Sequence, residues 1–428
     1  MLNWQAVKNI THGELGRFLA LMIVAWSPFT GGPRLPSLLL ALMGVWLLVT
    51  QGRRLLLSTA IRRWCVIFGL LWLPALLSIP GSFVWQRSAG IALVLLIYFL
   101  AGLALIQVLR SDQNRAWLIK WLAIVLSVWV VDGLIQYALG KDLLLIPLSE
   151  DGRVVGMFAS DLHLSLFLAI LLPLLLWRTI HITLAGTLML CVAAIVLVLL
   201  GGSRGTLVMV ALAALIAGWR LFRRYRLPVF AAVAIITAGL LILAPTPVLK
   251  ERIERSSLPK EISFDSINHI LSYRLYIWDT AVNMLVDRPL TGVGIGAFAA
   301  AYDTYSRRPL DVFRHGSPND QQTGVYHAHQ MYVSIAAETG LIGLAAIIAL
   351  YILCVKWYFL APPTRRDLAW PFACGLFVAS FPINSQPVLF THWYFPVLVL
   401  LVCAMLAALM GDDRAAENRD RLAAKIAA

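Results

Sequence analysis

Long apolar runs separated by short polar connections make up most of the chain. A helix needs about 20 apolar residues to cross a bilayer, and twelve runs come close to that length. An even number of spans places both termini on the same side of a membrane. The predicted helices cover residues 16–32, 35–51, 64–83, 88–109, 116–139, 158–177, 181–201, 205–221, 228–247, 329–358, 367–388 and 391–410.

The composition indicates the same class of protein. Hydrophobic residues make up 60% of the chain and charged residues 13%, with a mean hydropathy of +0.80. A soluble domain is nearer about half apolar and about a quarter charged. We therefore expect an all-α polytopic membrane protein, and a soluble enzyme, a disordered chain and a peripheral anchor are excluded. The five cysteines lie inside apolar runs, which favours core side chains over disulfides or a metal site.

Basic residues are distributed unevenly between the two sides of the predicted membrane. A net charge of +13 raises the question of nucleic-acid binding, but excess Lys and Arg also marks the cytoplasmic loops of membrane proteins. With both termini in the cytoplasm, the short outer connections hold only Arg34, Arg87, Lys141, Arg153 and Arg204. The bias predicts this orientation and no nucleic-acid partner. We expect no cleavable signal peptide, because the polar stretch 1–16 leads into a full-length span.

One long excursion divides the chain. We expect spans one to nine over 1–247, a large outer loop over 248–328, spans ten to twelve over 329–410 and a cytoplasmic tail over 411–428. Pro289 and the glycines after it predict turns within the loop. An amphipathic helix on the membrane or capping the bundle is predicted before them, because apolar residues recur every three or four positions at Leu271, Leu275, Trp278, Val282 and Leu285.

Two histidines stand where the outer loop returns to the membrane. His327 and His329 flank Ala328 just before the tenth span. A neutral imidazole can accept a proton from a hydroxyl, although capping of the helix end is an equal alternative. Positions i and i+2 do not share a helix face, and no Asp, Glu or Cys follows at ligand spacing, so we expect no metal.

The tenth predicted span has a face of small residues. Gly340 and Gly343 lie below His329 at helical spacing, and small residues in membrane helices usually mark close helix packing. Glu338 is half a turn out of phase with His329. We expect Glu338 to have a structural partner on another helix.

Arginines provide the positive charge of the same outer side. Arg204 lies in a glycine-rich turn between the seventh and eighth spans. Its guanidinium can form two hydrogen bonds to a phosphate, or it can extend from the helix end into water. Arg274 lies four residues before Trp278, and Arg288 lies on roughly the same face; alone, both are typical amphipathic-helix charges. Together these residues predict a cationic, His-bearing pocket that suits a lipid-linked pyrophosphate donor and an attacking hydroxyl. Composition alone allows a transporter equally well.

Several of these stretches resemble the bacterial O-antigen ligases. His329-Gln330, nine residues, Gly340, two residues and Gly343 match the His-Asn/Ser/Gln…Gly…Gly pattern of that family. Ser203-Arg204-Gly205 resembles its outer-face Arg motif, Arg274…Trp278 resembles the Arg of its periplasmic loop, and Pro289-Leu290-Thr291-Gly292-Val293-Gly294 resembles the segment that follows. Gly152-Arg153-Val154-Val155-Gly156 resembles, in degenerate form, an outer-loop motif.

The resemblance implies a GT-C-like glycosyltransferase of the bacterial inner membrane. Such a ligase moves O-antigen from undecaprenyl pyrophosphate to a sugar hydroxyl of lipid A-core at the periplasmic face, completing lipopolysaccharide. The reaction it implies is inverting, without a metal or other cofactor, with His329 as general base and Arg204 and Arg274 on the pyrophosphate. The same resemblance adds to the site His327, Arg288, Arg153, Gln330 and Trp278, with structural roles for Gly340, Gly343 and Glu338.

Other functions stay open at this stage. O-antigen polymerases and protein O-oligosaccharyltransferases use the same donor. A polymerase is expected to have a second large outer loop, but the corresponding connection over residues 140–157 is short. The latter often carry a further C-terminal periplasmic region, where this chain has a short tail. A transporter of lipid-linked glycans would want ionisable residues near the bilayer midplane, and the candidates are Asp132 and Glu338.

Overall fold

The computed structural model of the chain describes residues 4–29, 31–159, 163–179, 184–202, 204–225, 263–315, 327–382 and 389–410. Within these ranges the secondary structure is helical, without a named strand. The helices are α1 Trp4–Ala25, α2 Arg34–Leu57, α3 Thr59–Leu77, α4 Trp85–Leu109, α5 Asp112–Leu139, the 3₁₀ turn η1 Gly156–Phe158, α6 His163–Thr179, α7 Leu184–Gly201, α8 Arg204–Tyr225, α11 Phe264–Ile270, α12 Arg274–Asp287, α13 Phe298–Tyr305, α14 Met331–Leu360, α15 Pro363–Ala379 and α16 Phe395–Met410.

The predicted spans overlap helices wherever the structure describes them, and several of the helix ends differ by a few residues. Helices α2, α3, α4, α5 and α14 are long and apolar enough to cross a membrane, and shorter apolar stretches lie in α6, α7, α8 and α16. The all-helical, polytopic class is thereby confirmed. The span predicted over 228–247 lies outside the described residues, so the number twelve stays a prediction.

Two helix ends differ from the prediction because of proline. The first helix begins at Trp4 and ends at Ala25 rather than extending to residue 32, since Pro28 and the glycines after it cannot continue a helix. The helix predicted over 367–388 ends at Ala379, three residues before Pro382. A proline disfavours helical backbone at the residue before it, which explains the early end.

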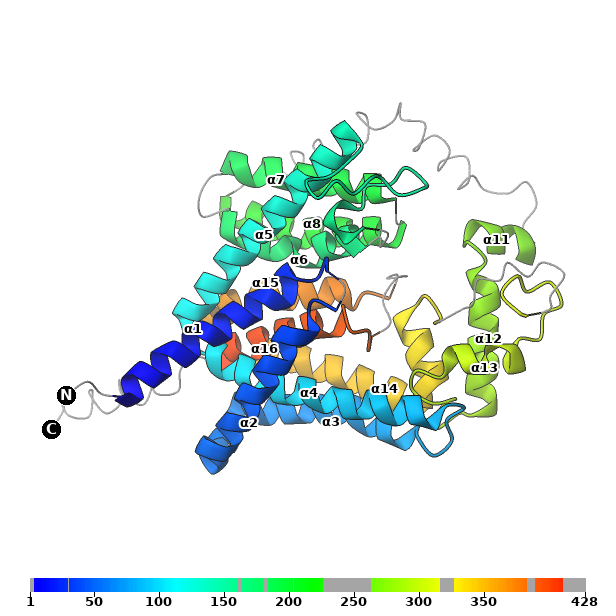
Figure 1. Cartoon of the computed structure of the whole chain (residues 1–428), viewed down its shortest axis with the longest axis horizontal. Helices are drawn as coiled ribbons and strands as arrows, with labels where there is room; N and C mark the ends of the chain where they lie inside the picture. Colours follow the sequence, from blue (N-terminus) through cyan, green and yellow to red (C-terminus); the bar gives the residue numbers. More distant parts are fainter. Residues whose placement is uncertain are drawn as a thin grey trace.

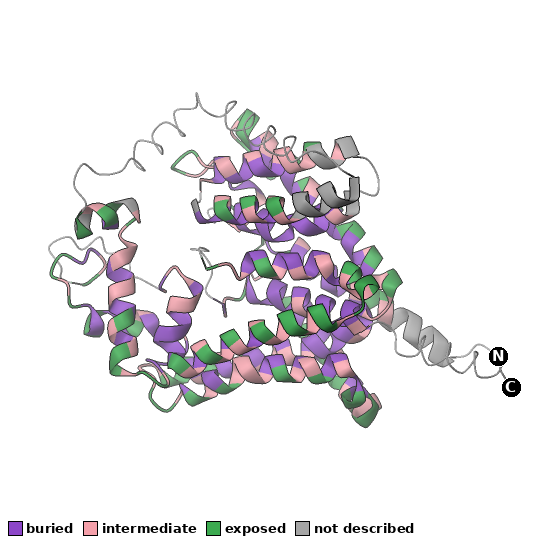
Figure 2. Cartoon of the chain, turned by 180° about the vertical axis from the view of Figure 1, so that it is seen from behind, coloured by how far each residue is buried: buried purple, intermediate pink, exposed green. Residues whose placement is uncertain are grey.

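The long helices form one bundle. Helix α2 packs along α4, α3 along α14, α6 against α7 and α8, and α15 against α16 (Figure 1). Buried side chains face the centre of this bundle and exposed ones its outer surface (Figure 2). Many of the exposed residues are large and apolar, such as Leu42, Val49 and Leu93. Apolar side chains on the outside of a helical bundle are what a lipid environment requires.

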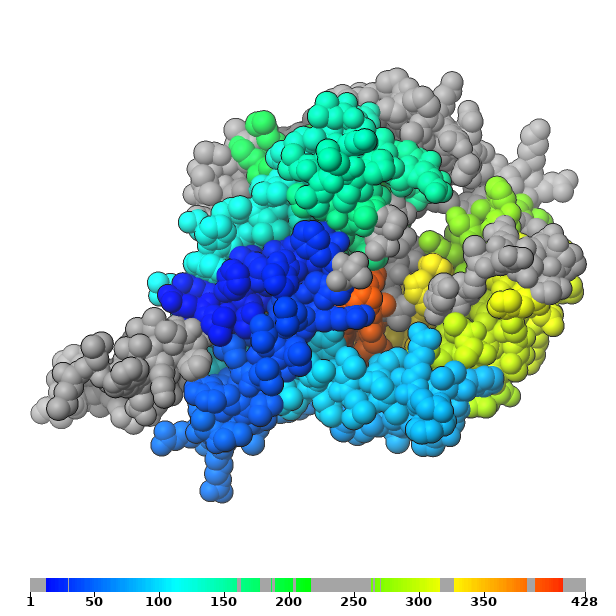
Figure 3. Space-filling view, in the orientation of Figure 1, coloured from blue at the N-terminus to red at the C-terminus, as the bar shows by residue number. Residues whose placement is uncertain are grey.

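Helices α11, α12 and α13 form a lobe, residues 263–315, at one end of the bundle (Figure 3). The lobe has a small core of its own around Ile277, Met284 and Phe298. Arg308 fastens α11 to α12, because its guanidinium pairs with Asp279 at 3.0 Å and lies 3.9 Å over the Phe264 ring. Residues 263–315 of the predicted outer loop are therefore folded, with side-chain contacts between their helices.

The amphipathic helix of the lobe is shorter than the periodicity predicted. Leu271 ends α11, and Ser272 and Tyr273 take left-handed backbone angles before α12 begins. Asn268 is buried and accepts a hydrogen bond from Leu275 N–H at 3.0 Å, which caps the first turn of α12. The apolar period continues across this break, so hydrophobic spacing alone did not reveal it.

Hydrogen bonds join the lobe to the turn between α3 and α4. Phe83 N–H donates to the carbonyl of Val293 at 3.0 Å. The Ser88 hydroxyl donates to the carbonyl of Ile295 at 2.7 Å, and Ile295 N–H donates to the Ser78 hydroxyl at 3.1 Å. The segment after α12 is thus fixed to the bundle at what we name the lobe end.

Candidate active site

The two histidines lie side by side in the turn that leads into α14, residues 327–330, which we name the His turn. Their ring centroids are 4.2 Å apart at an interplanar angle of 73°. The residue between them, Ala328, is fully buried. Its carbonyl accepts a hydrogen bond from the Trp278 indole N–H at 3.0 Å, and its N–H donates to the Ser334 hydroxyl at 3.2 Å. Both backbone groups of Ala328 are therefore held, which fixes the position of each imidazole.

His329 has a left-handed backbone, with φ +48°. This region is uncommon for residues other than glycine, although His visits it more readily than most. The turn that it makes is held from both sides by Trp278 on α12 and Ser334 on α14. Sequence analysis did not single out Ser334. Its only signal there was a hydroxyl in an otherwise apolar run.

The electrostatics of the pair favour neutral imidazoles. Burial, followed by the positive charges of His327 and Arg274, lowers the pKa of His329 to about 4. Burial also lowers the pKa of His327. Near pH 7 both rings are neutral and can accept a proton. Nδ1 of His327 is buried and has no hydrogen-bond partner in the described part of the chain.

Arg274 is brought to the His turn by the fold. It is the first residue of α12, and its charge acts on His329 although 55 positions separate the two in the chain. Arg204 is the first residue of α8, after a turn in which Gly202 takes φ +69°. The side chain of Arg204 lies outside the described part of the structure. Its placement beside the histidines therefore stays a prediction.

Arg288 lies directly after α12 and contacts the turn between α3 and α4. It follows the last residue of α12, and its guanidinium donates to the carbonyl of Gly81 and stacks 4.9 Å over the Phe83 ring. These contacts join the lobe to the turn between α3 and α4. Arg288 was predicted to lie on roughly the same helical face as Arg274, fourteen residues later. In the structure α12 ends at Asp287, and a loop carbonyl and an aromatic ring bind the Arg288 side chain.

Gln330 caps α14. Its side-chain oxygen accepts a hydrogen bond from Val333 N–H at 2.6 Å, which satisfies one of the free N–H groups of the first turn. Its amide nitrogen donates to the carbonyl of Pro382 at 2.9 Å. The contacts of Gln330 therefore hold the His turn to the segment that follows α15.

A break in α14 explains the first glycine of the motif. Gly340 has φ +67° and ψ −164°, far from helical values. A Cβ at this position would fall within contact distance of the Leu290 carbonyl and 2.6 Å from Thr291 N. The expectation that Gly340 packs against another helix is therefore wrong: the backbone of the segment 289–294 approaches it instead. Gly343 faces the side chain of Thr339 in its own helix.

The segment 289–294 replaces the hydrogen bonds that the break removes from α14. The carbonyls of Ala337 and Glu338 accept from Val293 and Gly294 N–H groups, at 2.9 and 3.0 Å. On the other side of the break, Leu341 N–H donates to the carbonyl of Pro289 at 2.8 Å, and Ile342 N–H donates to that of Leu290 at 3.3 Å. The first part of α14, which follows the His turn, is thus a separate rigid piece joined to the lobe.

The carboxylate of Glu338 is buried at the start of α13. It accepts a hydrogen bond from Phe298 N–H, the first residue of that helix, at 3.4 Å. The contact provides a partner for one of the free N–H groups at the start of α13. The contact joins α14 to the lobe a second time.

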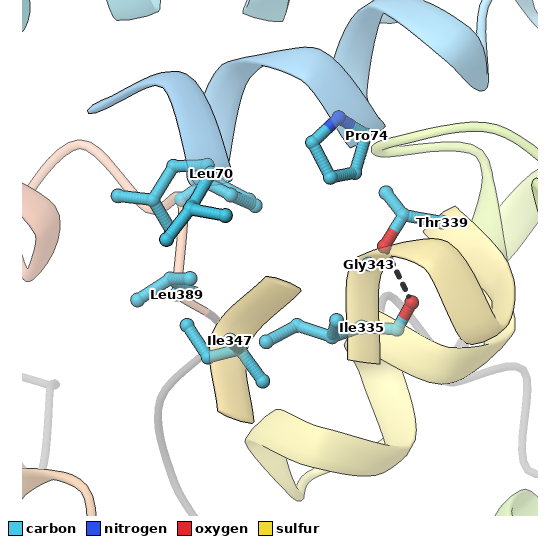
Figure 4. Close-up of a pocket in the computed structure, with 9 residues that line it drawn as sticks. Leu70, Pro74, Ile335, Thr339, Gly343, Ile347 and Leu389 are labelled. Atoms are coloured by element: carbon cyan, nitrogen blue, oxygen red, sulfur yellow. Dashed lines mark hydrogen bonds between the residues drawn. The ribbon is translucent and has the colours of Figure 1, made fainter. Parts of the chain in front are cut away.

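A small apolar pocket lies beside the break, between α3 and α14 (Figure 4). Thr339 is its main polar residue, and the Thr339 hydroxyl donates to the carbonyl of Ile335 at 2.8 Å within α14. The pocket is therefore dry in character. Its lining comprises Leu70, Leu71, Pro74, Ile335, Thr339, Gly343, Ile347, Leu389 and Phe390.

Arg153 lies in the connection between α5 and η1. Its guanidinium pairs with Asp151 at 3.0 Å. Among the described residues, no group of three His, Cys, Asp or Glu side chains is placed to hold a metal ion.

The fold and this arrangement define a multi-pass helical membrane protein whose candidate site combines two neutral imidazoles with the charge of an arginine. Residues 188–348 match the family model described as O-antigen ligase, which supports a relationship to the O-antigen ligase family over that part of the chain. The match runs from α7 to α14 and includes Arg204, Arg274 and the His turn. Members of this family are glycosyltransferase-like enzymes that act on polysaccharides. A comparison with curated proteins gave no match.

Proposed function

We propose that the protein is an O-antigen ligase of the bacterial inner membrane, with the lobe end of the bundle facing the periplasm and both termini in the cytoplasm. Its donor is O-antigen on undecaprenyl pyrophosphate, its acceptor is a sugar hydroxyl of lipid A-core, and its product is complete lipopolysaccharide. The observation that carries the proposal is the ring contact between the partly buried His329 and His327, centroids 4.2 Å apart, with the charge of Arg274 acting on His329.

In this mechanism His329 accepts the proton of the acceptor hydroxyl. The hydroxyl oxygen attacks the anomeric carbon of the first donor sugar, the bond from that carbon to the pyrophosphate oxygen breaks, and undecaprenyl pyrophosphate leaves with the electron pair. The configuration at the carbon inverts, because attack and departure take place on opposite faces. Arg274 and Arg204 stabilise the negative charge that develops on the leaving group.

Two sister activities share this chemistry. A polymerase would extend the donor glycan, and a protein O-oligosaccharyltransferase would use a peptide hydroxyl. The short connection over 140–157 favours the ligase over the polymerase. The predicted tail over 411–428 lies outside the described residues.

The test is a transfer assay with the full-length protein in detergent or liposomes, in the presence of EDTA. Undecaprenyl-pyrophosphate-linked glycan serves as donor, and lipid A-core, free glycan-lipid and a peptide serve as acceptors. We expect modification of lipid A-core despite the chelator. Lengthening of the donor glycan, or glycosylation of the peptide, would move the acceptor assignment to a sister activity.

Substitution of the histidine tests the base. General-base catalysis contributes about 100- to 10,000-fold, so we expect His329→Ala to lower kcat by about that factor in a protein that still folds. His315→Ala is the matched control, because His315 lies on the lobe, 73% exposed, and pairs with Asp303 rather than with the His turn. Normal transfer by His329→Ala would show that the catalytic assignment is wrong.

A further inference from the structure

Besides the apolar pocket, a polar cavity lies on the connection between α5 and η1. It has a volume of about 530 Å³, within the usual range for small-molecule sites. The connection projects at the same end of the bundle as the lobe (Figure 1). The polar part of its lining consists of Ser149, Glu150, Asp151 and Arg153.

The connection that forms this cavity is held by a buried glutamine. Gln136 on α5 accepts hydrogen bonds from Val155 and Gly156 N–H groups at 2.9 and 2.8 Å. Its amide nitrogen donates to the carbonyls of Ile146 and Pro147 at 3.2 and 3.1 Å. All four hydrogen-bonding positions of the side-chain amide are thereby used, on both arms of the connection.

A buried aspartate holds the same connection at two further points. Asp132, one helical turn earlier on α5, accepts from Leu143 N–H at 3.0 Å and from Met157 N–H at 3.1 Å. The cavity is therefore preformed, and a ligand does not have to order the chain in order to bind.

The charges of the lining select the kind of ligand. Among the described residues of the lining, Arg153 is the one basic residue; its guanidinium pairs with Asp151 at 3.0 Å, and Glu150 precedes Asp151 in the chain. Two carboxylates against one guanidinium disfavour a pyrophosphate, because like charges repel. Carboxylates accept hydrogen bonds from sugar hydroxyls, and a guanidinium donates to their oxygens. The Arg153 side chain is partly exposed, so its terminal N–H groups can reach a ligand while one of them pairs with Asp151.

From this geometry we infer that the cavity is a carbohydrate subsite, in which Asp151 and Arg153 bind hydroxyl groups of a glycan. This inference rests on the proposed function for the identity of the glycan, which is either the donor polysaccharide or the core of the acceptor. It gives Arg153 a role different from that of Arg274: Arg153 binds sugar and not pyrophosphate.

Kinetics of the full-length protein distinguish the two sources. Asp151→Asn and Arg153→Gln remove the charges and leave Asp132 and Gln136 in place, so the connection keeps its anchors. We expect KM to rise about tenfold, equivalent to about 1.4 kcal/mol, with kcat at saturation unchanged. A higher KM for the donor alone assigns the cavity to the donor glycan. A higher KM for the acceptor alone assigns it to the lipid A-core. Unchanged KM values for both substrates would overturn the inference.

The control and the binding probes separate a failed subsite from a failed function. Asp303→Asn removes an exposed carboxylate of the lobe outside the cavity, and should leave both KM values unchanged. Free oligosaccharide released from the donor, and inorganic pyrophosphate, are then added to the wild-type protein, and hydrogen exchange of residues 146–153 is followed. Protection by the oligosaccharide alone supports the subsite, even if no transfer is found; protection by pyrophosphate alone, or by neither probe, refutes it.

Discussion

Gly340 gives the most direct test of how the His turn is built. In Gly340→Ala the new Cβ would meet the carbonyl of Leu290, and the alanine would have to keep φ +67°. With φ +67° and ψ −164° the backbone lies in a region that essentially only glycine adopts, which costs another residue about 1–3 kcal/mol. Retreat of the segment 289–294 would loosen four backbone hydrogen bonds, each contributing about 0.5–1.5 kcal/mol. We expect a loss of about 3–9 kcal/mol in stability, which exceeds the effect of most single substitutions.

The assay is thermal unfolding of the purified protein in detergent, followed by transfer activity of the fraction that stays folded. Gly69→Ala is the matched control: Gly69 lies inside α3, and a Cβ there would meet nothing within 4 Å. That control should unfold at the wild-type temperature or slightly above it, because alanine favours helix over glycine by about 1 kcal/mol. If Gly340→Ala unfolds at the same temperature as Gly69→Ala, the account of the break in α14 is wrong.

Four further predictions concern the site and its supports. Because burial and neighbouring positive charge lower the pKa of His329 to about 4, the base loses its function only as the pH falls towards about 4; a loss of kcat centred on the usual value of about 6.5 would contradict this. The lowered pKa of His329 also predicts that the folded protein loses stability as the pH falls from about 6.5 to about 4, because the unfolded chain binds the proton at a higher pH than the folded one. Unfolding temperatures measured across that pH range test this. Ser334→Ala should lower kcat more than it raises KM, because Ser334 positions the base without touching substrate, and Ser334→Thr should restore kcat; equal kcat in both variants would refute the positioning role. Gln136→Ala should leave buried backbone groups unpaired and destabilise the protein by about 1–3 kcal/mol, as unfolding in detergent would show, whereas Gln107→Ala on α4 should be nearly neutral because Gln107 bonds only the neighbouring Arg110.

The sequence predicted the helices well, because a bilayer span is a local property. Length and apolar content decide it, and no tertiary partner is needed. The helix ends near Pro28 and Pro382 were missed, although the residues that cause them are visible in the sequence. The break at Gly340 could not be predicted in the same way. The apolar run continues across it, and a single glycine does not reveal which other segment supplies the missing hydrogen bonds.

The sequence predicted which residues belong to the candidate site better than it predicted how their side chains are arranged. The resemblance indicated His329 and Arg274, and the structure places the charge of one near the ring of the other. Arg288 and Gln330 belong to the same motifs, but their contacts hold the lobe and the His turn in place. A motif records which residues occur together. It does not separate those that face a substrate from those that hold the site together, because both depend on neighbours distant in sequence.

The two buried carboxylates weigh against transport as the function. A transporter needs ionisable groups that exchange partners as the substrate moves. Asp132 uses both of its oxygens on the N–H groups of Leu143 and Met157, and Glu338 binds the N–H of Phe298. Each carboxylate therefore stabilises a loop or helix start at the lobe end of the bundle, and binding a migrating ion would require giving up that contact. The same two residues that sequence analysis set aside as transport candidates are better explained as supports of a preformed surface, which is what transfer between two bound glycans requires.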